Sequence, residues 1–594
     1  MRRPTLFRTL PMAAALALVA ACGTTATTTA ATTTSESAEE AAVESTAAVT
    51  ITTDNAVDHD DAADHAWDEA DEIAITLDGD TATSTSDAVV VDGSVVTITA
   101  AGTYRISGTL DDGQIVVAAP EAAMVRLVLD GVDVSSSTSS PIVVTDAEEV
   151  QIVLADGSQN VVSDATTYVY ATAETDEPNA AIFSSANLTI AGTGSLTVEG
   201  NSNDGIASKD GLVITGGDIT VTAVDDGIRG KDYLVIDDGD LTVTAGGDGL
   251  KSDNEEDATT GYVSVAAGTL TVDAGADAVD AFTDVIVTGG TLDLTAGGGS
   301  SATVADGASA KGLKGSVSVI VAGGTLAVDA ADDAVHSNTA VTVSGGDLTI
   351  ASGDDAVHAD ASLTVSGGSI LVTDAYEGLE SALITITDGT IDLTTADDGV
   401  NVSGGNDASG TTTAQAPGQR GGPGGAADTF AEGSGVLSIS GGTIVVSSGG
   451  DGLDSNGSFE MTGGTAVVSG PTDNGNGSLD VDSTFTVTGG VLIAVGSAGM
   501  AMAPSGGEGT VSAQFGSTQQ AGTVVHVVSA AGDVVASFVS TKDFSSVVLS
   551  SPELVAGESY SVYTGGSATG TTLGGYAADG DLDGATSLGT VTAS

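Results

Sequence analysis

The sequence is poor in cysteine, in basic residues and in aromatic residues. Its 594 residues include one cysteine, 13 lysines and arginines together, and 3% aromatic residues with the single tryptophan Trp67. One cysteine excludes an intrachain disulfide. The shortage of basic residues argues against nucleic-acid binding, because such binding depends largely on lysine and arginine neutralising phosphates. The low aromatic content argues against broad aromatic platforms for sugar rings.

Glycine and acidic residues are abundant instead. The chain has 82 glycines, 82 aspartates and glutamates together, and a formal net charge of -69. A charge of this size is typical of disorder, but 41% of the residues are hydrophobic and recur in short alternating runs of Val, Ile, Leu and Thr. We therefore expect an ordered all-β protein with an acidic surface, which favours divalent cations as partners.

The N-terminus carries the features of a bacterial secretion signal. Arg2 and Arg3 precede a short apolar run at 12–20, which is too short to span a membrane. The run ends in Val19-Ala20-Ala21-Cys22, which is similar to a lipobox. We expect residues 1–21 to be a lipoprotein signal peptide and Cys22 to be lipidated, which predicts an extracellular protein anchored by lipid to the outer face of the bacterial cell membrane. The alternative is an ordinary signal peptide with a chance cysteine.

Four further segments follow from composition and rhythm. Residues 22–53, rich in Thr, Ala and Ser, are expected to be a disordered spacer. Residues 54–180 are expected to form an N-terminal β region that caps the repeat. Its acidic start contains His59, His65 and Trp67, which fit either docking of Trp67 on the first strands or a metal site. Residues 504–594 are expected to form a small antiparallel β module.

The central segment, 181–503, is a repeat. A strand followed by a glycine step recurs mostly every 21 or 22 residues, and we expect a mobile loop at 404–434 where Gly, Thr and Pro break the period. The last glycine of each step is Gly217, Gly239, Gly268, Gly290, Gly324, Gly346, Gly368, Gly389, Gly442, Gly464 and Gly490. About three short strands with their turns fit into 22 residues. The repeat predicts a parallel β-helix with about 22 residues per rung, whose stacking closes one core. A leucine-rich horseshoe has a similar period, but its Leu and Asn frame is missing.

Acidic residues recur about nine positions after the glycine step. We call them the acid column: Asp204, Asp226, Asp248, Asp277, Asp333, Asp355, Glu377, Asp398 and Asp451. Stacked rungs would place these carboxylates about 4.8 Å apart, where two charges repel by about 3.5 kcal/mol at an effective dielectric constant of about 20. Protonation or bound cations must compensate this repulsion. Calcium suits such oxygen ligands, so we predict calcium on the acid column, with a solvated ridge and diffuse counterions as the alternative.

A second set of residues, the outer column, follows three positions later: Arg229, Lys251, Asp280, His336, His358, Glu380, Asn401 and Asp454. Pectate lyases combine calcium with a basic residue that abstracts a proton, so Arg229 and Lys251 raise a lyase hypothesis. Ion pairing of these two residues with Asp226 and Asp248 is the alternative that we favour. No Ser/His/Asp set can be identified, and we assign no catalytic residue.

Several segments resemble the carbohydrate-binding domain-containing proteins, whose best-known type is a clostridial β-helix that binds cellulose and polygalacturonate. The similar segments are Asp333 to Asn401, Gly450 to Gly457 with Met461 to Gly464 and Gly499 to Ala501, Trp67 to Asp156, and Ser550 to Tyr563. The resemblance implies a right-handed parallel β-helix that binds calcium and plant-wall polysaccharide without cleaving it. Two departures put calcium in question locally: Lys311 in a rung without its acid, and Asn474 in place of an aspartate.

We therefore expect a cell-surface lipoprotein that binds polysaccharide with the help of calcium. Its membrane contact is the lipid anchor alone, and nucleic acid is not a partner. A calcium-dependent pectate lyase-like enzyme and a structural adhesin or stalk remain as alternatives. The sequence does not identify the residues that contact sugar.

Overall fold

The computed structural model describes residues 54–172, 174–305, 307–403, 435–570 and 572–594. The predicted signal peptide, Cys22, the spacer and the loop at 404–434 lie outside these residues. The described residues form one compact unit. Within them, strands make up the regular structure and the one helical element is a 3-10 turn, Glu69–Asp71.

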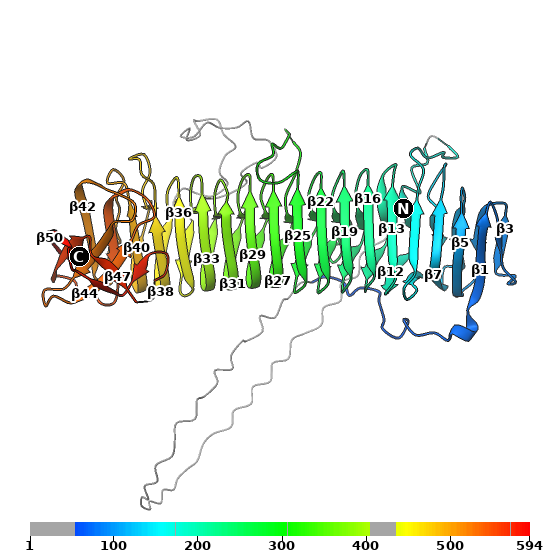
Figure 1. The fold of residues 1–594 in the computed structure, drawn as a ribbon, viewed down its shortest axis with the longest axis horizontal. Coiled ribbons are helices and arrows are strands. Elements are labelled where there is room, and N and C mark those ends of the chain that lie inside the picture. The colour runs from blue at the N-terminus through cyan, green and yellow to red at the C-terminus, as the bar shows by residue number, and fades with distance from the viewer. Residues whose placement is uncertain (1–53, 173, 306, 404–434, 571) are drawn as a thin grey trace, which may run out of the picture. The chain divides into compact units, whose positions relative to one another are not determined.

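In the middle of the stack one turn of the chain contains three strands, and each strand pairs in parallel with its counterpart in the next turn (Figure 1). β16 pairs with β19, β17 with β20 and β18 with β21. Asp218 lies opposite Asp240, which is the same position 22 residues later. These six strands span, in order, Asp218–Ala223, Ile228–Gly230, Tyr233–Ile236, Asp240–Ala245, Leu250–Ser252 and Tyr262–Val265.

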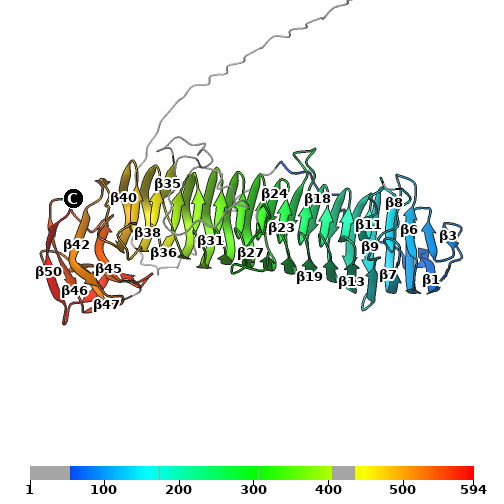
Figure 2. The same ribbon diagram turned by 90° about the horizontal axis from the view of Figure 1, so that it is seen from above.

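The turns build two long sheets, one of 27 strands and one of 16 strands. Figure 2 labels four strands of the 16-stranded sheet, which occur in this order along the stack: β6, Gln114–Ala118; β8, Ile142–Asp146; β11, Ala180–Ser184; and β23, Val279–Ala281. Later in the chain, two strands of each turn merge into one 13-residue strand, whose middle holds a glycine pair in three cases and Asp388-Gly389 in the fourth. These merged strands are β27, Ser318–Ala330; β29, Ala340–Ser352; β31, Ser362–Asp374; and β33, Leu383–Thr395.

Glycine is required at the bend inside each merged strand. Gly346 has a φ of 86°, a conformation that side chains with a Cβ rarely adopt. A Cβ there would also lie 2.9 Å from the carbonyl oxygen of Gly323 in the preceding turn. The regular glycine step of the sequence therefore marks a corner where neighbouring turns approach closely.

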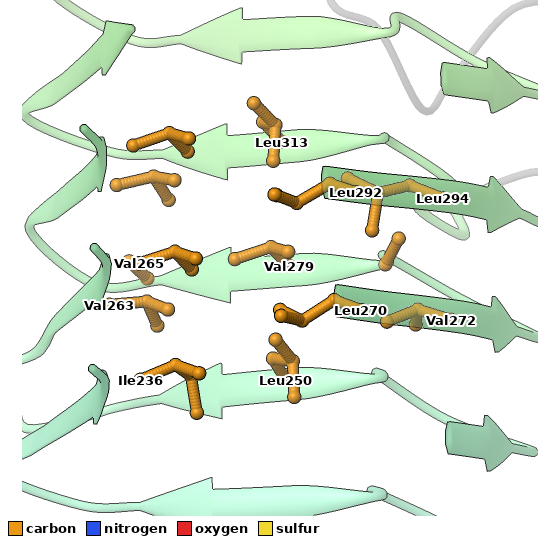
Figure 3. Close-up of a cluster of buried hydrophobic side chains, with 14 of the residues drawn as sticks. Ile236, Leu250, Val263, Val265, Leu270, Val272, Val279, Leu292, Leu294 and Leu313 are labelled. Carbon is orange, nitrogen blue, oxygen red and sulfur yellow. The ribbon is translucent and has the colours of Figure 1, made fainter. Parts of the chain in front are cut away.

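The core lies inside the stack and consists of rows of aliphatic side chains. In β19 exposed and buried residues alternate, so that Leu241 and Val243 point inward. Figure 3 shows such a row, in which Leu250, Val279 and Leu313 of successive turns lie above one another. Burying each of these side chains stabilises the fold by roughly 1.5–3 kcal/mol. No turn has a complete core of its own, so stability depends on stacking.

Parallel pairing begins well before residue 181. β1 pairs with β5, β5 with β7 and β7 with β9, all in parallel. The region 54–180 is thus largely the first part of the stack, and the hairpin of β3 with β4 ends the 16-stranded sheet. The bounds are β1, Ile73–Gly79; β3, Val89–Asp92; β4, Val95–Ile98; β5, Gly102–Leu110; β7, Met124–Ser135; and β9, Glu149–Leu154.

The other end of the stack meets a region of antiparallel strands. β40, Phe485–Gly496, pairs in parallel with β38, Ser458–Ser469, and antiparallel with β45, Phe544–Ser550. A five-stranded sheet follows, and its apolar residues share a core with Ile493 and Val495 of β40. The antiparallel strands therefore cover the apolar side chains that the last turn leaves.

Residues 54–72 cross the outside of the stack, and we call them the strap. Two ring nitrogens of His59 lie 3.0 Å from the Tyr233 hydroxyl and 2.9 Å from Thr189 Oγ1. Tyr262 donates a hydrogen bond to the Ala56 carbonyl. Further along, the Trp67 ring packs 4.7 Å from the guanidinium of Arg126 in β7. Trp67 thus docks on the first strands, and His59 is held by hydroxyl groups.

These observations confirm the coarse prediction of an all-β chain with large parallel sheets. No helix in the described part of the chain is long and apolar enough to cross a membrane. The right-handed parallel β-helix class and its rung size stay predictions, as do the domain bounds.

Candidate metal centres on an acid column

Strand register brings the predicted acids together. Each acid lies two residues before the first aligned aliphatic residue of a short strand in the 16-stranded sheet. These strands pair in parallel without a gap from β14, Asp204–Ser208, to β39, Leu479–Val481. The acids Asp204, Asp226, Asp248, Asp277, Asp333, Asp355, Glu377, Asp398 and Asp451 therefore stand in consecutive turns, with Lys311 between Asp277 and Asp333.

One sequence interpretation is wrong. Leu453 pairs with Leu479, so the position after Asp451 in the acid column is Gly477. Asn474 lies in the loop before it. The loop between Ser469 and Leu479 is longer than the equivalent loop between Ser448 and Leu453 in the preceding turn. This extra length shifted the apparent register of the sequence.

The structure gives the acid column a role that sequence reasoning missed. The Oδ1 atom of one acid accepts a hydrogen bond from the backbone N–H at the same position in the next turn. Asp226 Oδ1 accepts from Asp248 N at 2.9 Å, and Asp248 Oδ1 accepts from Asp277 N at 3.0 Å. Asp333 and Asp398 accept in the same way from Asp355 and Asp451. Short acidic side chains at turns often bond nearby amides, and the regular spacing of Asp was the available signal.

In the first part of the column, from Asp226 to Asp333, basic side chains of the chain contact the second oxygen of each carboxylate. Lys251 Nζ lies 2.7 Å from Asp248 Oδ2 and 3.0 Å from Asp226 Oδ2. Lys314 Nζ lies 2.8 Å from Asp277, and Lys311 Nζ lies 2.7 Å from Asp333. These acids are thus neutralised by cations that belong to the chain.

Asp204, at the start of the column, is less well matched. Its side chain is buried, and its nearest cation is Arg229 NH1 at 3.9 Å. Its Oδ2 has no hydrogen-bond partner among the described residues. Burial, followed by the charge of Asp226, raises the pKa of Asp204 to about 7.

The second part of the column runs from Asp355 to Asp451. The charges that shift the pKa values of its acids are mostly those of other carboxylates. Burial, then Asp451, Asp454 and Asp397, raise the pKa of Asp398 to about 8. Burial, then Glu380 and Asp398, raise the pKa of Glu377 well above its usual value. A bound cation would favour the ionised form of such a carboxylate and so lower its pKa.

Four groups of side chains among the described residues could hold a metal ion, each with three ligand atoms within 4.8 Å of one another. They are Asp248, Asp277 and Asp280; Asp332, Asp333 and Asp354; Asp355, His358 and Glu380; and Asp398, Asp451 and Asp454. In the first two groups Lys251, Lys314 and Lys311 already contact the carboxylates. The last group consists of oxygen ligands from the second part of the column.

The last group fits a hard cation on a further observation. Asn401 lies between Glu380 and Asp454 in neighbouring strands, and its Nδ2 donates to Glu377 at 2.7 Å. Its Oδ1 is buried, and none of the described residues forms a hydrogen bond with it. An amide oxygen beside aspartate oxygens is a ligand set that calcium accepts.

The basic residues of the outer column form ion pairs. Lys251 bonds two acids, and although burial lowers it, Asp248 and Asp226 raise the pKa of Lys251 overall. Arg229 pairs with Asp253 at 2.6 Å, not with Asp226. A lysine held in its charged form cannot accept a proton, which weighs against the role of base in a lyase.

The comparisons with known proteins agree with the expected resemblance. Residues 92–356 match the sequence model of the carbohydrate-binding domain-containing protein family. A carbohydrate-binding domain-containing protein of Acetivibrio thermocellus is 40% identical over 137 residues, which are 23% of this chain and 48% of that protein. The chain thus spans about half the length of this curated relative. The predicted family resemblance is confirmed for this region.

A solved structure is also similar. It is described as the polysaccharide lyase-like protein from C. thermocellum in a gadolinium derivative. The two sequences are 39% identical, and the match covers 38% of this chain and 92% of the other, with a TM-score of 0.38.

Proposed function

We propose that this chain is a cell-surface lipoprotein, anchored through Cys22, that binds polysaccharide without cleaving it, on a right-handed parallel β-helix with about 22 residues per rung. The observation that carries the proposal is the match of residues 92–356 to a carbohydrate-binding family. The long, regular stack supports it, because an extended glycan chain can lie along many equivalent turns.

Calcium enters the proposal through the second part of the acid column. We assign it first to Asp398, Asp451 and Asp454, with Asn401 Oδ1 beside them, since these ligands are all oxygen atoms. We do not assign it to Asp226, Asp248, Asp277 or Asp333, where lysines contact the carboxylates. Calcium binding there would require each lysine to leave its acid.

Calcium also explains how so acidic a protein would bind an acidic glycan. A chain with a net charge of -69 repels a polyuronate, and salt screens this repulsion only beyond about 10 Å. Calcium on the column can bridge a protein carboxylate and a uronate. Neutral glucans need no such bridge, so their binding does not depend on calcium.

The test is calorimetry of the purified chain with polygalacturonate and with soluble cello-oligosaccharides, in calcium and in chelator. We expect binding of polygalacturonate that chelator abolishes and that Asp398→Asn weakens. Asp240→Asn is the matched control, because it removes one charge from an exposed position on the other sheet.

Three results would overturn the proposal. Tight binding of polygalacturonate in chelator would remove the calcium bridge. Release of unsaturated product that absorbs ultraviolet light would show a lyase. Absence of binding to either glycan, with or without calcium, would leave the role of a structural stalk.

A further inference from the structure

Two histidines stand in adjacent turns and start from the same surroundings. His336 in β28, Val335–Ser337, and His358 in β30, Val357–Ala359, are stacked with ring centroids 5.0 Å apart and an interplanar angle of 9°. Each Nδ1 faces the acid three residues earlier: Asp333 Oδ2 at 2.8 Å and Asp355 Oδ2 at 3.1 Å. The two positions thus form a matched pair.

The pair differs in the third group, which contacts the acid at His336 and the imidazole at His358. At His336 the third group is a cation, because Lys311 Nζ also bonds Asp333 Oδ2, at 2.7 Å. At His358 it is an acid, because Glu380 Oε2 lies 3.2 Å from Nδ1. The ligand atoms of Asp355, His358 and Glu380 therefore converge; Asp355 and His358 are buried and Glu380 is partly exposed.

We propose that Asp355, His358 and Glu380 form a binding site for a divalent transition metal of the zinc class, which binds His358 Nδ1 and one oxygen of each carboxylate. The proposal goes beyond glycan binding and does not depend on it. Among the four candidate groups in the described residues, this is the one that contains an imidazole. Imidazole nitrogen suits zinc and its neighbours, whereas calcium takes oxygen ligands.

The spacing of the ligand atoms agrees with this metal class. Zinc binds nitrogen and oxygen at about 2.0–2.2 Å in a tetrahedral arrangement, which places neighbouring ligand atoms about 3.4 Å apart. The distances from His358 Nδ1 to Asp355 Oδ2 and Glu380 Oε2 are 3.1 and 3.2 Å. Small side-chain movements would admit the ion.

The surroundings also provide the outer contacts that zinc sites use. His358 Nε2 lies 3.1 Å from Asp360 Oδ1, which reproduces the arrangement of carboxylate, histidine and metal in known sites. Ser403 Oγ donates a hydrogen bond to Glu380 Oε1, which leaves the other oxygen, Oε2, toward His358. Both contacts hold the ligands in a fixed orientation.

The experiment is calorimetric titration of the purified full chain with Zn²⁺ in millimolar calcium, with Co²⁺ as a probe that absorbs visible light. We expect one ion per chain and cobalt absorption of a tetrahedral site. His358→Gln should abolish this binding, His336→Gln should preserve it, and Asp360→Asn should weaken it about 10- to 100-fold.

Equal zinc binding by the wild type and His358→Gln, or equal loss in both histidine variants, would overturn the proposal. So would competition by calcium, because the ligand set then belongs to the calcium class. Circular dichroism checks that each variant is folded. If His358→Gln does not fold, Asp360→Asn decides the matter, and an affinity and cobalt spectrum equal to those of the wild type would overturn the proposal. Loss of calcium-dependent glycan binding would leave this result unaffected, so the two proposals fail separately.

Discussion

The two parts of the acid column share one backbone arrangement but balance their charge differently. From Asp226 to Asp333 each carboxylate contacts a lysine of the chain. From Asp355 to Asp451 the acids are surrounded by further acids, a histidine and an asparagine. In both parts a backbone N–H of the next turn donates the same hydrogen bond to the acid. The backbone arrangement therefore uses an acid at most positions of the column, with Lys311 and Gly477 as exceptions, and the sequence determines where the counter-charge comes from.

The distribution of basic residues explains the difference. Between Lys314 and Lys542 the sequence contains one lysine or arginine, Arg420, which lies outside the described residues. The first part of the column is thus a closed set of ion pairs. We propose that calcium supplies counter-charge in the second part, so the two parts should respond differently to mutation, metal and pH.

The largest effect is expected from Lys311→Met. The Lys311 side chain is 4% exposed and bonds Asp332 at 2.9 Å and Asp333 at 2.7 Å. Removing one partner of a buried ion pair costs about 3–5 kcal/mol, because it leaves uncompensated charge. Chemical unfolding followed by circular dichroism measures this loss.

Lys209→Met is the control for Lys311→Met. Lys209 pairs with Glu177, and both side chains are more than 40% exposed. Exposed pairs contribute at most about 1 kcal/mol. Equal losses in the two variants would contradict the view that fixed cations hold the first part together.

The next effect is stabilisation by calcium, which we expect in the second part alone. A ligand of the native state adds about 2.7 kcal/mol at a hundredfold excess over its dissociation constant. The melting temperature should therefore be higher in calcium than in chelator, both for the wild type and for Asp248→Asn. Asp398→Asn should lose most of this difference. An unchanged calcium response in Asp398→Asn would move the site elsewhere.

A smaller effect concerns pH, and its sign is opposite to that of an ordinary paired carboxylate. The pKa of Asp398 rises from 3.8 to about 8 in the fold, so the native state holds more protons than the unfolded state between these values. Stability in chelator should therefore fall as the pH rises from about 5 to about 8.

Melting temperatures across this pH range measure the effect. Asp398→Asn should remove much of the slope, and Asp204, with a pKa of about 7, should account for part of the remainder. Calcium should flatten the curve, because it binds the ionised carboxylates. A melting temperature that rises with pH in chelator would contradict this prediction.

The sequence predicted what repeats and missed what varies. The glycine step and the acid column keep their phase, and strand register places Ile206, Ile228 and Leu250 in line as the repeat requires. The start of parallel pairing at β1 was not apparent, because the early turns lack the regular glycine step. Asn474 was assigned to the position of the acid column that Gly477 occupies, because one longer loop hides the register.

The sequence also did not predict which side chains contact each other between turns. The pairing of Arg229 with Asp253 and of Lys311 with Asp333 joins residues more than 20 positions apart. Such partners depend on how each side chain leaves its corner of the stack, and spacing alone does not determine that direction. The contrast between Lys311 and Glu380 beside the stacked histidines was visible only once these directions were known.

The strap determines where a mechanical load would enter the molecule. Ala56 donates to the carbonyl of Thr259 and accepts from Tyr262, far along the stack from β1, where the parallel strands begin. A pulling force on residue 54 would thus reach these contacts first, then His59, and then Trp67. They would break one after another, as in peeling, before tension reached the sheet at Ile73. The strap would serve as a sacrificial element that absorbs work and protects the stack from being unwound from its end.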